Sequence, residues 1–109
     1  MAETYTFFQD LPSQAAETPP GSILSLSILN ENGVKATLFR FAPGQELTEH
    51  SAGYPAILHF LEGEADLTLG GDAKKARAGT WVYMPAQLAH SLVAKTPVVM
   101  LLLLLAGPA

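Results

Sequence analysis

The sequence contains no cysteine among its 109 residues. Disulfides, thiolate nucleophiles and sulfur-ligated metal sites are therefore excluded together. Charged residues make up only 15% of the chain and hydrophobic residues 49%, a balance far from that of disordered proteins. A chain of this length fits one domain of about 100–150 residues. The composition thus predicts one domain with a buried apolar core.

Positive charge is also scarce. Six Lys and Arg residues face ten Asp and Glu residues, for a formal net charge of −4. The basic residues are scattered along the sequence apart from the pair Lys74-Lys75. Because a nucleic-acid-binding protein needs a positive strip to neutralise the phosphate backbone, we expect no nucleic acid partner.

The chain has no long hydrophobic run. Its most apolar stretch, Val98 to Leu105, is far shorter than the roughly 20 residues of a membrane-spanning helix. The start, Met1 to Thr4, has no basic region and is followed by no sustained apolar segment, so a secretion signal is not indicated. Together with the lack of cysteine, which is compatible with a reducing compartment, these features predict a cytoplasmic protein with no membrane partner.

Helical periodicity is weak throughout, and short segments of strand character recur with Gly, Pro or Asn between them. Leu and Ile alternate with Ser in residues 23–29, and Asn30 to Gly33 supplies the positive-φ residues of a tight turn. A βαβ fold is excluded, because each parallel crossover needs a dozen or more residues and the expected strands follow one another without a long helix between them. The strands are expected at residues 23–29, 34–41, up to 50, 56–61, 64–69, 73–78, 81–84, 90–94 and 98–105.

The domain organisation follows from this pattern. Residues 1–22, which include Pro19-Pro20, are expected to form an N-terminal arm that lies on the barrel or is exchanged with a neighbouring subunit. Residues 23–109 are expected to form a single β-barrel domain.

Two clusters of residues carry a family resemblance. The first resembles the first motif of the cupin superfamily, which reads Gly, five residues, His, one residue, His, three or four residues, Glu, six residues, Gly; here Gly44, His50 and Gly63 match it. Ala52 and Ala56 stand at the positions of the second His and the Glu. The first motif is therefore half complete.

The second cluster resembles the second cupin motif, which reads Gly, five residues, Pro, one residue, Gly, two residues, His, three residues, Asn. Gly79, Pro85 and His90 match it, whereas Gln87 and Ala94 replace its second Gly and its Asn. The resemblance covers roughly residues 34 to 105 and implies an all-β fold, the double-stranded β-helix or jelly-roll barrel of small RmlC-like cupins.

The same resemblance implies a metal site that this chain does not complete. Cupins that hold a metal use three imidazoles and a carboxylate, but only His50 and His90 remain here. Two imidazoles bind a divalent Zn, Fe, Mn or Ni ion far more weakly than four protein ligands. His59 is a third candidate ligand, but it differs in strand parity from residue 56, so it faces outward unless a β-bulge intervenes.

The interior positions predict either an apolar cavity for a small hydrophobic or aromatic ligand or a barrel filled by its own side chains. Trp81 and Phe39 are expected among the filling residues. The ligand-binding residues implied by this alignment are His50, His90, Ala52, Ala56, Leu58, Phe60, Met84 and Leu92.

Three functions remain open from the sequence. The first is a small-molecule-binding barrel without a complete metal site. The second is an enzyme, either a metal-dependent oxygenase or isomerase using His50 and His90, or a metal-free isomerase in which one of them moves a proton. The third is a purely structural or interaction protein. Candidate polar partners for the histidines are Glu46, Glu49, Tyr54 and Tyr83.

The outward faces of the strands are unusually apolar. Both parities of Val98 to Leu105 are hydrophobic, as are Ile57 and Leu61 on either side of His59. A strand that is apolar on both faces needs cover on its second face. We therefore expect a homodimer, as cupins commonly form.

Overall fold

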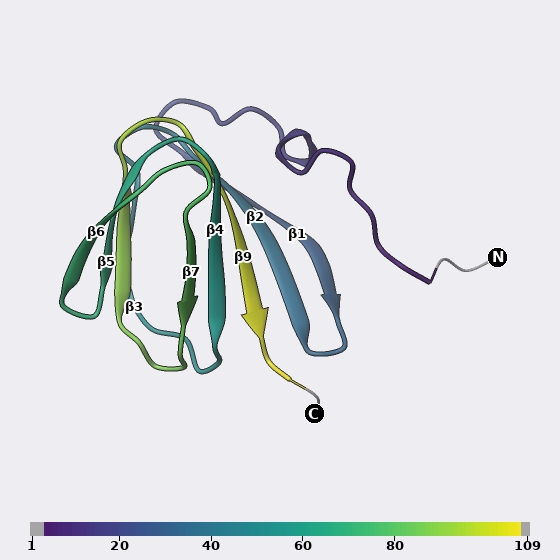
Figure 1. Ribbon diagram of the computed structural model, residues 1–109. Helices are drawn as coiled ribbons and strands as arrows, with labels where there is room; N and C mark the ends of the chain where they lie inside the picture. Colours follow the sequence, from purple (N-terminus) through teal and green to yellow (C-terminus); the bar gives the residue numbers. More distant parts are fainter. Residues whose placement is uncertain (1–3, 108–109) are drawn as a thin grey trace.

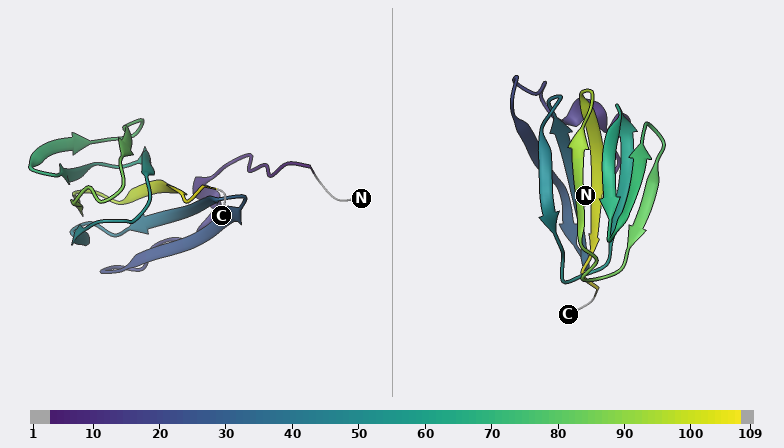
Figure 2. Two further views of the ribbon diagram at one scale, coloured as in Figure 1. Left: turned by 90° about the horizontal axis from the view of Figure 1, so that it is seen from below. Right: turned by 90° about the vertical axis from the view of Figure 1, so that its left-hand side faces the viewer.

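The protein folds into two antiparallel β-sheets. A computed structural model describes residues 4–107, and within that range one sheet has the strand order β1-β2-β9-β4-β7 and the other β3-β8-β5-β6. The sheets face each other as the two walls of a jelly-roll barrel (Figure 1, Figure 2), the all-β fold that the sequence predicts. The strands are β1 (Ile23–Glu31), β2 (Val34–Phe41), β3 (Glu46–His50), β4 (Ala56–Glu62), β5 (Ala65–Leu69), β6 (Asp72–Ala76), β7 (Trp81–Met84), β8 (His90–Ala94) and β9 (Val98–Leu105).

The first hairpin turns on two residues. Asn32 and Gly33 have positive φ values of 53° and 79°, the conformation that fits a two-residue turn to the right-handed twist of its strands. Because the turn is this tight, β1 continues to Glu31, past the end at residue 29 that the sequence predicts. A shift of register between Ser27 and Leu29 places a bulge in β1.

β6 is shorter than the sequence predicts, because a turn begins directly after Ala76. The Arg77 amide donates to the Thr80 hydroxyl oxygen at 3.0 Å, and the Thr80 amide donates to the Arg77 carbonyl oxygen at 2.9 Å. Gly79 lies inside this turn at a φ of 94°, where a side chain would be strained. Residue 78 is therefore part of the turn and not of the strand.

β9 is the central strand of the five-stranded sheet and pairs with β2 on one side and β4 on the other. Val98, Val99 and Met100 follow one another in the sequence and are each at most 3% exposed. Since neighbouring side chains of a strand point to opposite faces, this part of β9 is buried on both faces.

The core lies between the two sheets. Along β4, Ala56, Leu58 and Phe60 are 2%, 3% and 0% exposed, whereas the residues between them are half-buried. These three side chains belong to one apolar cluster that also contains Met84 of β7 and Leu92 of β8. Side chains therefore pack the barrel interior.

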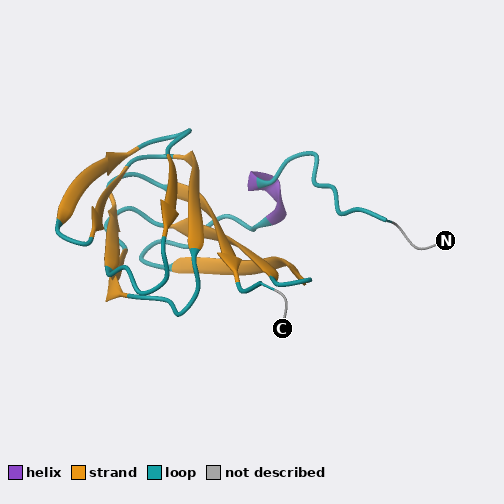
Figure 3. Ribbon diagram, turned by 60° about the horizontal axis from the view of Figure 1, so that its bottom comes forward, coloured by secondary structure: helices purple, strands orange, loops and turns teal. Residues whose placement is uncertain are grey.

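The N-terminal segment crosses the outside of the barrel. A short 3₁₀ helix, η1 (Pro12–Gln14), lies outside the barrel (Figure 3). The Arg40 side chain of β2 donates to the Pro12 carbonyl oxygen at 2.6 Å. Before η1, residues 6–11 border a groove that they share with Leu29, Ala36 and Leu101 of the five-stranded sheet. Tyr5 and Phe7 are nevertheless 71% and 73% exposed, and the chain then extends beyond the sheets toward its N-terminus (Figure 1). Among the described residues, no helix has the length and apolar character needed to cross a membrane.

Candidate functional site

His50 and His90 face each other across neighbouring strands. His50 ends β3, His90 begins β8, and the two residues are direct partners in the register of the sheet. Their ring centroids lie 4.2 Å apart with the planes tilted by 55°. The pairing depends on an irregularity of register between Leu47 and His50. We call these two side chains the imidazole pair.

Each ring of the imidazole pair is held by a backbone carbonyl group. Nδ1 of His50 lies 2.8 Å from the Thr48 carbonyl oxygen, and Nδ1 of His90 lies 3.0 Å from that of Leu88. A carbonyl oxygen only accepts hydrogen bonds, so both Nδ1 atoms carry the proton. In the neutral rings both Nε2 atoms are then acceptors with a free lone pair. Two neutral rings in this state have no N–H left with which to hydrogen-bond each other.

The imidazole pair lies where the packed interior meets solvent. His90 is only 9% exposed, whereas His50 is exposed. Ala56 and Met84 are partners at the end of the β4–β7 ladder, and both are 2% exposed. The predicted ligand-binding residues thus divide into two groups. His50 and the half-buried Ala52 reach the surface, whereas the deeper members lie in the core cluster: Ala56, Leu58, Phe60, Met84 and Leu92.

His59 does not join the imidazole pair. Its partners in the sheet are Trp81 on β7 and Leu101 on β9, and the register is regular on both sides from Ala56 to His59. The irregularity in β4 comes later, between Phe60 and Glu62. With no bulge to reverse its parity, His59 lies on the outer face of the sheet.

Trp81 and Tyr83 share that outer face. They alternate with Val82 and Met84 along β7 and are 59% and 52% exposed. The expectation that Trp81 fills the barrel is therefore wrong, because Met84 faces inward and residue 81 has the opposite parity. Phe39, by contrast, packs against the core and stacks on Phe41 with centroids 5.9 Å apart.

The donor set does not fit the four-ligand metal centre of the family. Alanines stand at two of the ligand positions, and within residues 4–107 no group of three or more His, Cys, Asp or Glu residues is placed to hold a metal ion. Glu46 and Glu49, the nearest acids along β3, are exposed side chains. The site therefore offers two imidazole nitrogens and no neighbouring carboxylate ligand.

The sequence of the barrel decides the family. Residues 37–104 match the cupin domain. This protein is a cupin. The match confirms the resemblance found in the two motifs, and it covers the strands from β2 to β9 that carry the imidazole pair.

Solved structures share the fold of this cupin. A conserved protein of unknown function from Streptococcus pyogenes is 25% identical with a TM-score of 0.82, over 100% of this chain and 93% of that one. A cupin superfamily protein from Desulfitobacterium hafniense is 24% identical with a TM-score of 0.78, over 83% of each chain. An RmlC-like cupin from Shewanella frigidimarina is 20% identical with a TM-score of 0.78, over 97% of this chain and 93% of that one. Among curated protein sequences nothing matches this chain.

Gln87, which departs from the second cupin motif, has a left-handed backbone conformation. It stands at the position of the second motif's Gly, and it adopts a φ of 70° that glycine would take without strain. The backbone N–H of Gln87 donates to the Ala52 carbonyl oxygen at 2.8 Å, which connects the loop before His90 to the loop after His50. In the sequence alone Gln87 is a mismatch to the motif, although a motif glycine is itself a signal of positive φ.

Proposed function

We propose that this cupin binds a small, partly apolar ligand at the imidazole pair, without a four-ligand metal centre. The observation that carries the proposal is the shared hydrogen-bonding state of the two rings, whose Nδ1 atoms both donate to backbone carbonyl groups. The two Nε2 atoms then accept hydrogen bonds, so the ligand needs an O–H or N–H donor. His90 and Leu92 are both buried on the inner face of β8, and Leu92 belongs to the apolar core cluster, which favours a ligand with an aromatic or aliphatic body.

A phenol tests this proposal directly. p-Cresol carries one donor on an apolar ring, and its methyl ether, 4-methylanisole, has nearly the same shape without the donor. We expect p-cresol to shift the imidazole proton resonances of both histidines saturably. The ether is expected to bind about threefold to tenfold more weakly, because a hydrogen bond contributes about 0.5–1.5 kcal/mol.

Three variants complete that experiment. His90→Ala and His50→Ala are expected to weaken p-cresol binding about threefold to tenfold each, by removing one acceptor. His59→Ala, on the outer face, serves as the matched control and is expected to leave binding unchanged. Equal responses to p-cresol and its ether, or a loss of binding in His59→Ala alone, would overturn the proposal.

A second candidate function is a metal-dependent oxygenase or isomerase that uses His50 and His90 as an incomplete ligand set. The observation in its favour is again the two Nε2 lone pairs, which a Zn, Fe, Mn or Ni ion accepts. Metal analysis of protein purified without a histidine tag separates the two functions. Stoichiometric metal that His50→Ala removes favours the enzyme, whereas p-cresol binding to metal-free protein favours the ligand-binding barrel.

We also propose that the outer face of the five-stranded sheet pairs with a second copy of the chain. Trp81 and Tyr83 are exposed there, and the half-buried Ile57, Leu101 and Leu103 continue the same face. Exposed aromatic side chains on a continuous apolar surface are typical of protein interfaces. The exposed start of the arm supports its docking on, or exchange with, that second copy.

A charge reversal tests the dimer. Trp81→Glu is expected to shift the protein from dimer to monomer at micromolar concentration, because it buries a charge in an apolar interface. The measurement is light scattering after size-exclusion chromatography. Tyr54→Glu is the matched control, since Tyr54 is a 50% exposed aromatic residue outside the sheet. If the native protein is monomeric, or if both variants dissociate equally, the proposed interface is wrong.

A further inference from the structure

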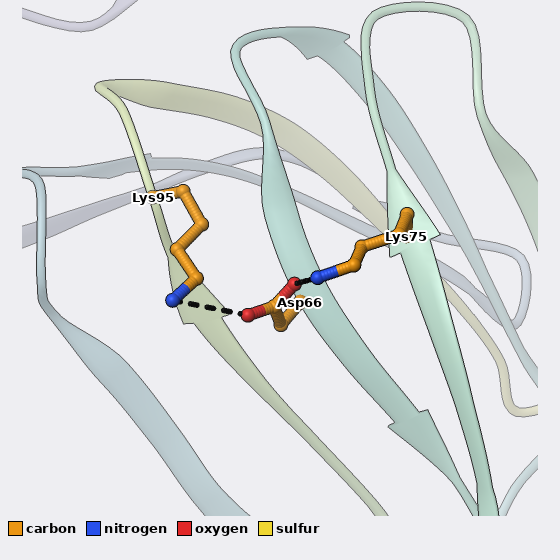
Figure 4. A network of polar contacts seen from close by, with 3 residues as sticks. All are labelled: Asp66, Lys75 and Lys95. Carbon is orange, nitrogen blue, oxygen red and sulfur yellow. Dashed lines mark hydrogen bonds and ion pairs between the residues drawn. The ribbon is translucent and has the colours of Figure 1, made fainter.

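A cluster of charged side chains lies on the outer face of the other sheet, away from the imidazole pair. Asp66 on β5 is the strand partner of Lys75 on β6, and Lys95 follows β8, which pairs with β5 on its other side. Figure 4 shows both lysines pointing at the Asp66 carboxylate. Lys75 Nζ lies 2.6 Å from Oδ1 and Lys95 Nζ 3.1 Å from Oδ2. Residues that are far apart in the sequence thus converge on one point.

The cluster borders a hollow of about 360 Å³. Three cationic side chains line it, Lys75, Arg77 and Lys95, together with the two acids Glu64 and Asp66. Half of the six basic residues of a chain with a net charge of −4 therefore surround a single hollow. The lining of the hollow thus has more cations than acids, whereas the rest of the molecule has more acids than cations.

The cluster has hydrogen-bond donors to spare. The hydrogen bond from Lys75, followed by that from Lys95, holds the pKa of Asp66 below its usual value, so the carboxylate stays charged near neutral pH. Each ammonium group has three N–H donors and makes one contact with Asp66. Within residues 4–107 no ion pair involves the Arg77 guanidinium, which carries five donors in a planar fork suited to an oxyanion.

We propose that this hollow binds the oxyanion group of a small molecule, a phosphate or a carboxylate, between Arg77 and the two lysines. Asp66 acts as an internal competitor, because it occupies one donor of each ammonium group. The site is exposed, so each charged contact contributes little and binding is expected in the millimolar range. It is separate from the imidazole pair, and its occupation does not depend on the function of that pair.

The two sides of the competition predict opposite effects. In a titration with inorganic phosphate at constant ionic strength, followed by backbone amide resonances, we expect saturable shifts at residues 64–66, 75–77 and 95. Arg77→Gln is expected to weaken binding about twofold to fivefold, since it removes one exposed charged donor. Asp66→Asn is expected to strengthen binding severalfold, since it frees both ammonium groups and removes a repelling charge.

Lys35→Gln provides the matched control, because Lys35 is an exposed cation on β2 in the opposite sheet. It changes the net charge as Arg77→Gln does and is expected to leave phosphate binding unchanged. Acetate in a parallel titration distinguishes a carboxylate site from a phosphate site. Shifts that do not saturate, or equal weakening by Lys35→Gln and Arg77→Gln, show only a general charge effect and overturn the proposal.

Discussion

Replacing Gly63 with alanine is expected to lower the free energy of unfolding by about 3 kcal/mol or more. Gly63 has a φ of 89° at the corner between β4 and β5, and an added Cβ would lie 2.9 Å from Val98 Cα and in hard contact with the Pro97 carbonyl oxygen. Both contacts are with backbone atoms, one in the loop before β9 and the other at the first residue of β9. The new methyl group therefore strains its own residue and displaces the central strand of the sheet.

Two other motif glycines separate these contributions. Gly44 and Gly79 have φ values of 85° and 94°, and an added Cβ at either would meet nothing within 4 Å. Gly44→Ala and Gly79→Ala are each expected to cost only the backbone strain, about 1–2 kcal/mol. Urea unfolding of the three variants measures the difference. Equal costs at all three positions would show that the close approach of Gly63 to Pro97 has no energetic weight.

Replacing Phe60 with alanine is expected to cost about 3–5 kcal/mol. Phe60 is 0% exposed and belongs to the core cluster. Its backbone N–H donates to the Thr80 carbonyl oxygen and its carbonyl oxygen accepts from the Gly79 N–H, each at 2.8 Å. Truncation leaves a void between the two sheets, and the surrounding side chains relax into it only partially. Phe60→Leu, which keeps most of the apolar volume, is expected to cost about 1–2 kcal/mol.

This second experiment also bears on function. A cost of less than about 1 kcal/mol for Phe60→Ala would contradict the packed interior of the structure and favour the open apolar cavity that the sequence also allows. If the cost is as large as expected, the interior is filled by side chains. A ligand of the imidazole pair then sits at the mouth of the barrel rather than deep inside it. Thermal or urea unfolding of both variants decides between these arrangements.

The motif glycines explain why the fold was predictable from the sequence. Gly44, Gly63 and Gly79 all adopt positive φ at strand ends, so their spacing marks the corners of the barrel. The alternation within β4 fixed which of its residues face inward. The cytoplasmic location and the dimer, in contrast, stay predictions, because they depend on the surroundings of the chain.

The parts that were missed depend on register and local irregularity. Trp81 was expected inside on the strength of its size, although Met84 was also expected inside and the two differ in parity. The charged cluster was missed because Asp66, Lys75 and Lys95 become neighbours only when β5, β6 and β8 are aligned residue by residue. The hydrogen bonds of the two Nδ1 atoms depend on two backbone carbonyl groups, which no sequence motif specifies.

The position of β9 has a consequence for how the chain reaches its native state. β2 and β4 are not neighbours; each is joined to the sheet through β9, the last strand of the described chain. During synthesis the five-stranded wall therefore lacks its middle until residues 98–105 have left the ribosome. Because most native contacts join residues that are far apart in the sequence, folding is expected to be slow, on a scale of about milliseconds to seconds. Until then the apolar inner sides of β2 and β4 are open to water, and chaperones have their main opportunity to bind.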